Sequence, residues 1–163
     1  NWKNSLHTDL GEDFDVLIPQ MPNNQKARYR EWKIWFERIV PLLNDEVILL
    51  GHSLGGIFLA KYLAAHKFPK KIIALFLLAA PFVTPGKHPI ADFVLTGNLK
   101  GVEKQVLKIF IYHSMDDEIV PYFCARGYKR AFPEATLRTF RKYAHLNEPK
   151  FPELLKDLRL LRK

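Results

Sequence analysis

The sequence predicts an α/β fold in which a doubly wound, mostly parallel sheet is flanked by helices. Short apolar runs recur along the chain without strict alternation, and such runs are typical of strands buried on both faces of a parallel sheet. Segments with helical periodicity lie between these runs. This alternation of strands and helices is typical of βαβ units, whose crossovers are right-handed.

Apolar runs mark the predicted strands. They are Phe14–Ile18, Val47–Leu50, Ile72–Ala79 and Val106–Tyr112. Thr136–Phe140 is a weaker candidate, because its apolar and polar residues alternate poorly. In a sheet of this kind, ligands bind at the carboxyl ends of the strands.

Helical patterns occupy the segments between and after these strands. Apolar residues at 32, 35, 36, 39 and 40 follow the spacing of one helix face, and Pro41 closes that segment. Leu54–Ala65 is apolar nearly all round, which indicates a deeply packed helix. Further helices are predicted for residues 121–131 and 151–161, each with a proline in its first turn.

The composition is that of one globular domain. A chain of 163 residues with 48% hydrophobic residues can form its own core, so we expect residues 1–163 to form a single domain. The longest apolar run, Ile72–Phe82, is too short to span a membrane. Cys124 is the single cysteine, which excludes an internal disulfide and suits a cytoplasmic location. Its sequence context favours a helix or core position over a nucleophile.

The chain is basic, with a net charge of +8 and an isoelectric point of about 9.6. Such a charge can indicate an anionic partner. However, the Lys and Arg residues are scattered along the sequence, and no nucleic-acid-binding motif accompanies them. We therefore expect a basic surface without specific nucleic-acid binding.

The sequence Gly-His-Ser-Leu-Gly at residues 51–55 matches the pattern G-x-S-x-G. A predicted strand comes directly before it and a predicted helix directly after it, which is the context of a nucleophile elbow. The alternative of a phosphate-binding loop is disfavoured, because the turn lacks the lysine of that motif. The pattern therefore predicts that Ser53 is a nucleophile.

The physical demands of this turn predict the roles of its residues. A turn this sharp strains the backbone of Ser53 and lifts its hydroxyl above the edge of the sheet. Gly51 and Gly55, which lack Cβ atoms, are expected to let the strand and the helix approach each other. The N–H of Leu54, at the amino end of the helix, is expected to donate to an oxyanion.

A serine nucleophile needs a base and an orienting carboxylate, which should follow it in the order acid, then histidine. The downstream histidines are His66, His88, His113 and His145. His66 is expected to end the buried helix, His88 lies in a loop with proline and glycine, and His113 precedes the expected acid. His145 lies on a loop after the last strand, so it is the candidate base.

The acid is expected in the segment that follows the strand at 106–112. Asp116 and Asp117 both emerge there, at the same edge of the sheet as Ser53. Val120-Pro121 should fix the chain at the start of the next helix and so give a nearby aspartate a defined position. These arguments do not separate the two aspartates.

The motifs GHSLGG, HSMDDEIVP and AHLN, in that order, resemble the α/β-hydrolase superfamily. The resemblance is greatest to its small single-domain serine hydrolases related to retinoblastoma-binding protein 9, and it covers nearly the whole chain. It implies that Asp117, in the pattern D-x-x-[VL]-P, is the acid, with Ser53 as nucleophile and His145 as base. His52 is commonly histidine in the family elbow and is not the base there.

The chain departs from the family pattern in two places. The base histidine usually follows glycine, whereas here it follows Ala144. The family also opens with a strand that ends in a His-Gly turn and completes the oxyanion hole. That strand would lie between the predicted strands Phe14–Ile18 and Val47–Leu50, so we expect it to precede Asn1.

We therefore predict a serine hydrolase that cleaves an ester or related acyl bond of a small molecule through an acyl-enzyme, without a metal or cofactor. The segment Phe82–Glu103 is broken by proline and glycine, which predicts no large cap but a shallow pocket for short acyl groups. Phe82 and Phe93 are candidates to line it, although core packing would explain both equally well. The alternative function is a hydrolase scaffold that binds a protein partner.

Overall fold

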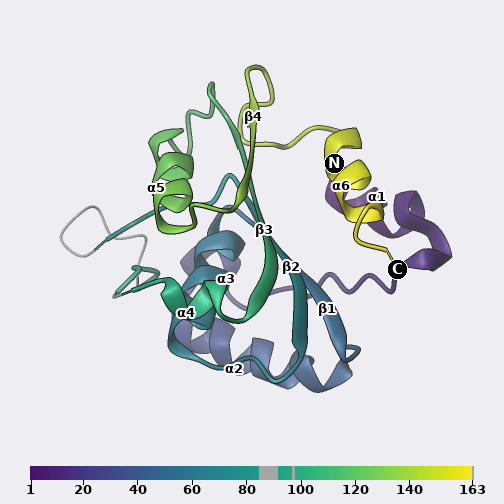
Figure 1. The fold of residues 1–163 in the computed structure, drawn as a ribbon, viewed down its shortest axis with the longest axis vertical. Coiled ribbons are helices and arrows are strands. Elements are labelled where there is room, and N and C mark those ends of the chain that lie inside the picture. Colours follow the sequence, from purple (N-terminus) through teal and green to yellow (C-terminus); the bar gives the residue numbers. More distant parts are fainter. Residues whose placement is uncertain (85–91, 97, 163) are drawn as a thin grey trace.

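The computed structural model describes residues 1–84, 92–96 and 98–162. These residues form a four-stranded sheet in the order β1-β2-β3-β4, and each neighbouring pair is parallel (Figure 1). The strands are β1 (Glu46–His52), β2 (Lys71–Leu78), β3 (Val106–Ser114) and β4 (Thr136–Phe140). All of them therefore end at one edge of the sheet, where α/β folds bind their ligands.

Helices cover both faces of the sheet. They are α1 (Trp2–Leu10), α2 (Tyr29–Ile39), α3 (Leu54–Ala65), α4 (Lys100–Glu103), α5 (Phe123–Ala131) and α6 (Pro152–Arg159), with 3₁₀ turns at Gly11–Asp13, Asn24–Lys26 and Val40–Leu42. Helices α2 to α5 contribute to the core on one face, and α1 and α6 to the core on the other (Figure 1). The predicted α/β class, with a parallel sheet between helices, is confirmed.

Strand β2 explains why the apolar runs do not alternate. Its residues Leu75 and Leu77 belong to the core under α2 to α5, whereas Ala74 and Phe76 belong to the core under α1 and α6. Successive side chains of a strand point to opposite faces, and helices cover both faces here. Every position of this strand segment is therefore buried and apolar.

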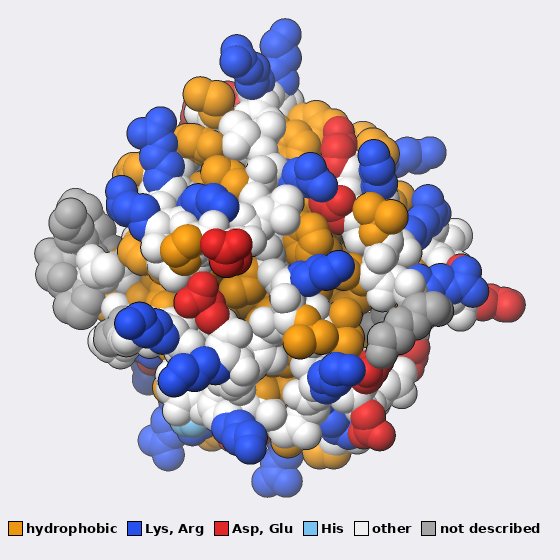
Figure 2. Space-filling view, in the orientation of Figure 1, with side chains coloured by type: hydrophobic (Ala, Val, Ile, Leu, Met, Phe, Trp, Pro, Cys, Tyr) orange, Lys and Arg blue, Asp and Glu red, His pale blue; other side chains and the backbone are white. Residues whose placement is uncertain are grey.

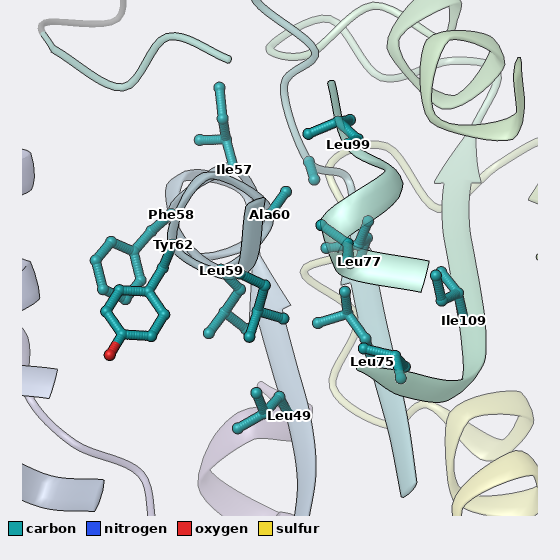
Figure 3. Close-up of a cluster of buried hydrophobic side chains, with 14 of the residues drawn as sticks. Leu49, Ile57, Phe58, Leu59, Ala60, Tyr62, Leu75, Leu77, Leu99 and Ile109 are labelled. Atoms are coloured by element: carbon teal, nitrogen blue, oxygen red, sulfur yellow. The ribbon is translucent and has the colours of Figure 1, made fainter. Parts of the chain in front are cut away.

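Helix α3 is apolar nearly all round because it is enclosed on two sides. In Figure 3, Phe58 and Tyr62 project from α3 away from the strands, whereas Leu75 and Leu77 project toward it from β2. The rings of Phe58 and Tyr62 pack against Phe36 of α2, with centroid distances of 5.4 and 5.1 Å. This enclosure anchors the helix that directly follows Ser53.

Helix α1 was not expected from the sequence, since most of its residues are polar. Its buried residues Trp2, Leu6 and Leu10 recur every four positions and pack on the sheet beside α6. The side chain of Asn1 caps the helix by accepting a hydrogen bond from the N–H of Lys3. Three well-spaced apolar residues and one cap are thus sufficient to dock this helix.

The predicted strands at 47–50, 72–79, 106–112 and 136–140 correspond to β1 to β4 and are confirmed within two residues at each end. The helices predicted for 54–65, 121–131 and 151–161 correspond to α3, α5 and α6.

The strand predicted for Phe14–Ile18 is wrong, because the structure assigns no strand there. Phe14 and Val16 pack against the core under α1 and α6, whereas Leu17 and Ile18 are 51% and 54% exposed. The segment therefore buries one side only. In the described residues it also lacks the hydrogen-bonded neighbour that a strand requires.

The surface carries its basic residues in a dispersed arrangement. On the face shown in Figure 2, Lys and Arg side chains lie between acidic and hydrophobic ones. Absence of specific nucleic-acid binding stays a prediction. Among the described residues, no helix is both long enough and apolar enough to cross a membrane.

Candidate active site

Ser53 lies in the sharp turn between β1 and α3. Its backbone has φ 53° and ψ −122°, a left-handed conformation that is unfavourable for residues with a Cβ. The N–H of Ser53 donates to the carbonyl of Leu78 over 2.8 Å, and its own carbonyl accepts from the N–H of Gly56 over 2.9 Å. The turn therefore has the strained geometry expected of a nucleophile elbow.

Of the two glycines predicted to allow the close approach of strand and helix, Gly51 is needed and Gly55 is not. A Cβ on Gly51 would lie 2.5 Å from the backbone of Gly55, so the strand can approach the helix only without one. A Cβ on Gly55 would meet no atom within 4 Å, so the predicted steric role of Gly55 is wrong. The second close approach is at Gly56, whose Cβ would lie 2.4 Å from that of Ala80.

Leu54 is the first residue of α3. The N–H of a residue at this position has no acceptor within the helix, and the helix dipole places partial positive charge there. This N–H can therefore donate to a negative oxygen formed beside Ser53, as the sequence predicts.

His145 and Asp117 form a buried hydrogen-bonded pair. His145 Nδ1 lies 2.8 Å from Asp117 Oδ2, and the two residues are only 8% and 7% exposed. The other carboxylate oxygen of Asp117 accepts from the N–H groups of Ile119 and Val120, each over 2.9 Å. The turn after β3 thus fixes the carboxylate, and the carboxylate fixes the imidazole.

Asp116, the competing candidate, has a different environment. Its side chain is exposed and accepts hydrogen bonds from the hydroxyl of Ser114 and from the N–H of Ala144. The hydrogen bond from Ser114 lowers the pKa of the Asp116 carboxyl. The structure therefore brings Asp117, and not Asp116, to the ring of His145.

His145 contacts the elbow through His52, the residue before Ser53. The Nε2 atom of His52 lies 2.7 Å from the carbonyl oxygen of His145, and the two imidazole centroids are 4.8 Å apart. Within the described residues no hydrogen bond joins the Ser53 hydroxyl to His145. In the described part of the chain, the contacts of His145 with the elbow thus run through His52.

The remaining histidines are placed differently. His113 is buried, with Nε2 2.7 Å from the carbonyl of Val120 and 3.5 Å from Asp117 Oδ2. Burial lowers the pKa of His113, which keeps its ring neutral. His66 caps the end of α3, and His88 lies outside the described residues.

The loop that carries His145 has strained residues on both sides. Ala144 has φ 41° and Leu146 has φ 55°, so both are left-handed without being glycine. The substitution of Ala144 for the glycine of the family pattern therefore has a conformational cost. Sequence reasoning missed the side chains that hold this loop, because they come from Trp2 and Asp116, far from it in sequence.

A cavity of about 490 Å³ adjoins the elbow. It is lined by residues 24–28, Leu54 and Phe93. Phe93 is fully buried in the core, and Phe82 packs edge-on against Tyr128 of α5 with a centroid distance of 5.0 Å. Of the two phenylalanines considered as pocket residues, only Phe93 borders this cavity.

In the part of the chain that the structure describes, no group of three His, Cys, Asp or Glu residues could hold a metal ion. Cys124 is buried in α5, in the helix position that its sequence context predicts.

The parallel sheet, the helices on both of its faces and the strained serine turn are those expected of the α/β-hydrolase fold. The chain belongs to the serine hydrolase family, whose family model matches residues 1–154. This membership confirms the resemblance found in the sequence, and it makes the protein a hydrolase with a small-molecule substrate.

Solved structures support the fold assignment. The ydeN gene product of B. subtilis is 18% identical with a TM-score of 0.76, and the match covers 88% of this chain and 80% of that chain. A carboxylesterase of the thaumarchaeon Nitrososphaera gargenis is 16% identical with a TM-score of 0.65, over 90% of this chain and 78% of that chain. A YdeN-like protein of Pectobacterium atrosepticum is 18% identical with a TM-score of 0.64, and the match covers 84% of this chain and 72% of that chain. No curated protein matches the chain.

Proposed function

We propose that the protein hydrolyses a carboxylic ester, or a related acyl bond, of a small molecule through a Ser53–His145–Asp117 triad. The observation that carries this proposal is the buried hydrogen bond of 2.8 Å between His145 and Asp117, beside the strained Ser53 turn. The name of the similar Nitrososphaera gargenis protein, a carboxylesterase, supports ester bonds as the substrate class.

The hydrogen bond to Asp117 determines which nitrogen of His145 can act as a base. Because Nδ1–H donates to the carboxylate, the neutral ring presents Nε2 as an acceptor. Nε2 takes the proton of the Ser53 hydroxyl while Oγ attacks the carbonyl carbon. The carboxylate of Asp117 then stabilises the imidazolium that forms.

The acyl-enzyme forms and breaks down through the same groups. The Leu54 N–H donates to the oxyanion of the tetrahedral intermediate. The imidazolium of His145 gives its proton to the leaving alcohol, which leaves the acyl group on Ser53. His145 next deprotonates a water molecule, whose oxygen attacks the acyl carbon and releases the acid and the free serine.

A second oxyanion donor completes the proposed site. β1 pairs with β2 on one side, and no strand of the described residues pairs with its other side. We propose that a strand preceding Asn1 fills this position and that its loop supplies the donor. Extending the chain by the residues encoded before Asn1 should raise the rate of serine acylation by about 10²- to 10³-fold. An equal rate in both chains would contradict this assignment.

The cavity beside Leu54 supports a preference for short acyl groups. Its volume of about 490 Å³ lies in the lower half of the range of ligand sites, and the buried Phe93 is among its lining residues. Rates with p-nitrophenyl esters of increasing chain length should fall beyond short chains. A strong preference for long chains would show that this cavity is not the acyl site.

A fluorophosphonate probe tests the chemistry directly, since it reacts only with an activated serine. We expect one label per chain, attached to Ser53 in peptide mass spectra, and no label in Ser53→Ala. Asp117→Asn should react far more slowly with the probe. Absence of labelling in the folded protein would refute the hydrolase mechanism and favour a scaffold that binds a partner.

A further inference from the structure

The loop of residues 143–148, here called the base loop, requires external support. His145 lies between Ala144 and Leu146, whose positive φ angles of 41° and 55° are unfavourable for residues with a Cβ. Such a backbone persists only where surrounding contacts hold it. The contacts of the base loop therefore determine where the imidazole of His145 lies.

One side of the base loop is held by the turn after β3. The N–H of Tyr143 donates to the hydroxyl of Ser114 over 3.1 Å, and the N–H of Ala144 donates to Asp116 Oδ1 over 3.1 Å. These contacts tie the base loop to the segment that carries Asp117. They do not connect it to the nucleophile.

The other side is held by α1 and by the elbow. The indole N–H of Trp2 donates to the carbonyl of Leu146 over 2.7 Å. The backbone N–H of Trp2 donates to the carbonyl of Glu148 over 3.0 Å. The Nε2 atom of His52 lies 2.7 Å from the carbonyl oxygen of His145. Of these contacts, only the last joins the base residue to the residue next to Ser53.

The contact between Lys3 and His52 determines the tautomer of His52. Lys3 Nζ lies 2.8 Å from His52 Nδ1, and an ammonium group has protons to donate but no lone pair to accept. Nδ1 is therefore an acceptor, and the ring proton is on Nε2. Nε2–H in turn faces the carbonyl of His145, which can only accept. Both ring nitrogens of His52 are thus matched to their partners.

Charge and burial keep this arrangement intact at neutral pH. Burial, followed by the positive charge of Lys3, lowers the pKa of His52 to about 4, and the charge of His145 acts in the same direction. The hydrogen bond to the His145 carbonyl and the carboxylate of Asp117 oppose this shift. The neutral ring keeps the acceptor that Lys3 needs.

We propose that Lys3 and His52 form a positioning pair that holds the base loop at the distance from Ser53 that proton transfer requires. The inference rests on the proposed function, because it takes His145 as the base. His52 touches no reacting atom: it ties the carbonyl of the base residue to the residue that precedes the nucleophile. Neither the serine motif nor the acid–histidine pair requires this pair of residues.

Four variants test the pair, each normalised to its folded fraction. His52→Phe removes both hydrogen bonds and keeps a ring, whereas His52→Gln keeps a donor and an acceptor. Lys3→Met removes the donor to Nδ1, and Lys108→Met, at an exposed position near the amino end of β3, is its matched control. A misplaced catalytic group can cost about 100-fold in rate. We expect His52→Phe to lower kcat by about this factor with little change in KM.

The conservative variant and the control make the outcome decisive. His52→Gln should recover most of the lost kcat, and Lys108→Met should resemble the parent protein. A fall in kcat of less than about tenfold in His52→Phe overturns the positioning role, since loss of a coupled hydrogen bond at a reacting geometry should exceed it. Failure of His52→Gln to exceed His52→Phe also overturns it.

The imidazole tautomer provides a readout that a purely structural role would not move. In ¹H–¹⁵N NMR spectra of the parent protein at neutral pH, His52 should be protonated on Nε2 alone. In Lys3→Met the Nδ1–H form should appear as well. An Nδ1–H tautomer in the parent protein overturns the pair itself.

The two proposals fail in different ways. If the parent protein neither reacts with the fluorophosphonate probe nor hydrolyses esters, the proposed function is wrong and the positioning role falls with it. If the parent protein is active and His52→Phe has unchanged kcat, the positioning role alone is wrong.

Discussion

His145 Nδ1 and Asp117 Oδ2 are 2.8 Å apart, although 28 residues separate them in the chain. The contact forms because β3 and β4 are parallel neighbours, so the segments that follow them emerge at the same edge of the sheet. Asp117 lies in the turn after β3, and His145 lies in the loop after β4. The topology of the sheet thus assembles an acid and a base from separate parts of the sequence.

Asp117→Asn should lower kcat by about 10⁴-fold, because an amide in place of the carboxylate favours the wrong tautomer of His145 and cannot stabilise its charged form. Asp116→Asn is the matched control. Its amide oxygen can still accept from the N–H of Ala144, so its kcat should fall by less than about tenfold. Steady-state ester hydrolysis measures both. The reverse order of effects would assign the acid to Asp116.

Three glycine-to-alanine variants should differ in stability in a way that the G-x-S-x-G pattern alone does not predict. Gly51→Ala and Gly56→Ala place a Cβ within 2.6 Å of other atoms, so each should lower the free energy of unfolding by several kcal/mol, roughly 2 or more. Gly55→Ala meets open space and should be neutral or stabilising by about 0.5 kcal/mol. Urea unfolding curves compare them, and a destabilised Gly55→Ala would contradict the geometry of the turn.

Ala144→Gly should stabilise the protein by about 1 kcal/mol, because glycine has no Cβ to oppose the φ of 41°. Ala65→Gly is a suitable control, since Ala65 is exposed at the end of α3 and glycine there should cost up to about 1 kcal/mol. The free energy of unfolding in urea measures both. Destabilisation by Ala144→Gly would show that the left-handed backbone is not strained.

The free energy of unfolding should fall below neutral pH, because the pKa of His52 is lowered in the folded protein. Its pKa is lowered from 6.5 to about 4 in the folded protein, mainly by burial. As the pH falls through 6.5, the unfolded chain binds a proton at this residue and the folded chain does not, so stability present above that pH is lost down to about pH 4. The full effect is about 3 kcal/mol.

Unfolding free energies measured across this pH range test the assignment. His52→Gln should flatten the pH dependence, because it removes a group whose pKa is lowered in the folded protein. His113, whose pKa is also lowered by burial, should account for part of the slope that remains. An unaltered slope in His52→Gln would mean that His52 titrates normally in the folded protein.

Local patterns predicted the parts of the fold that local physics determines. The apolar runs of β1 to β3 contact a hydrophobic core on both faces, and α3 is enclosed on two sides, so continuous hydrophobicity marked them well. Phe14–Ile18 is also mostly apolar but is covered on one side only, and composition does not reveal the number of covered faces.

The candidate site was predictable where order and spacing determine it. Ser53, Leu54 and His145 followed from the turn motif and from the strand ends. Asp116 and Asp117 could not be separated by sequence physics, because both emerge from β3. What separates them is the turn whose N–H groups, at 119 and 120, hold only the carboxylate of Asp117.

The supports of the base loop were not predictable, because they join distant residues. Lys3 and His52 are 49 residues apart, and no spacing rule connects a helix lysine with a histidine of the elbow. Gly56 likewise looked like an ordinary helix residue. Gly56 has no room for a Cβ because of Ala80, which lies after the next strand.

The hydrogen bond from the Trp2 indole to the Leu146 carbonyl joins residues 144 positions apart. During translation, a ribosome therefore completes β1 to β4 before the partner of Trp2 leaves the exit tunnel. A nascent chain that stops short of this point lacks the residues that anchor the imidazole of His145. In the proposed mechanism, the anchored base therefore assembles only after residue 146 has been synthesised, later than the segment that carries the serine.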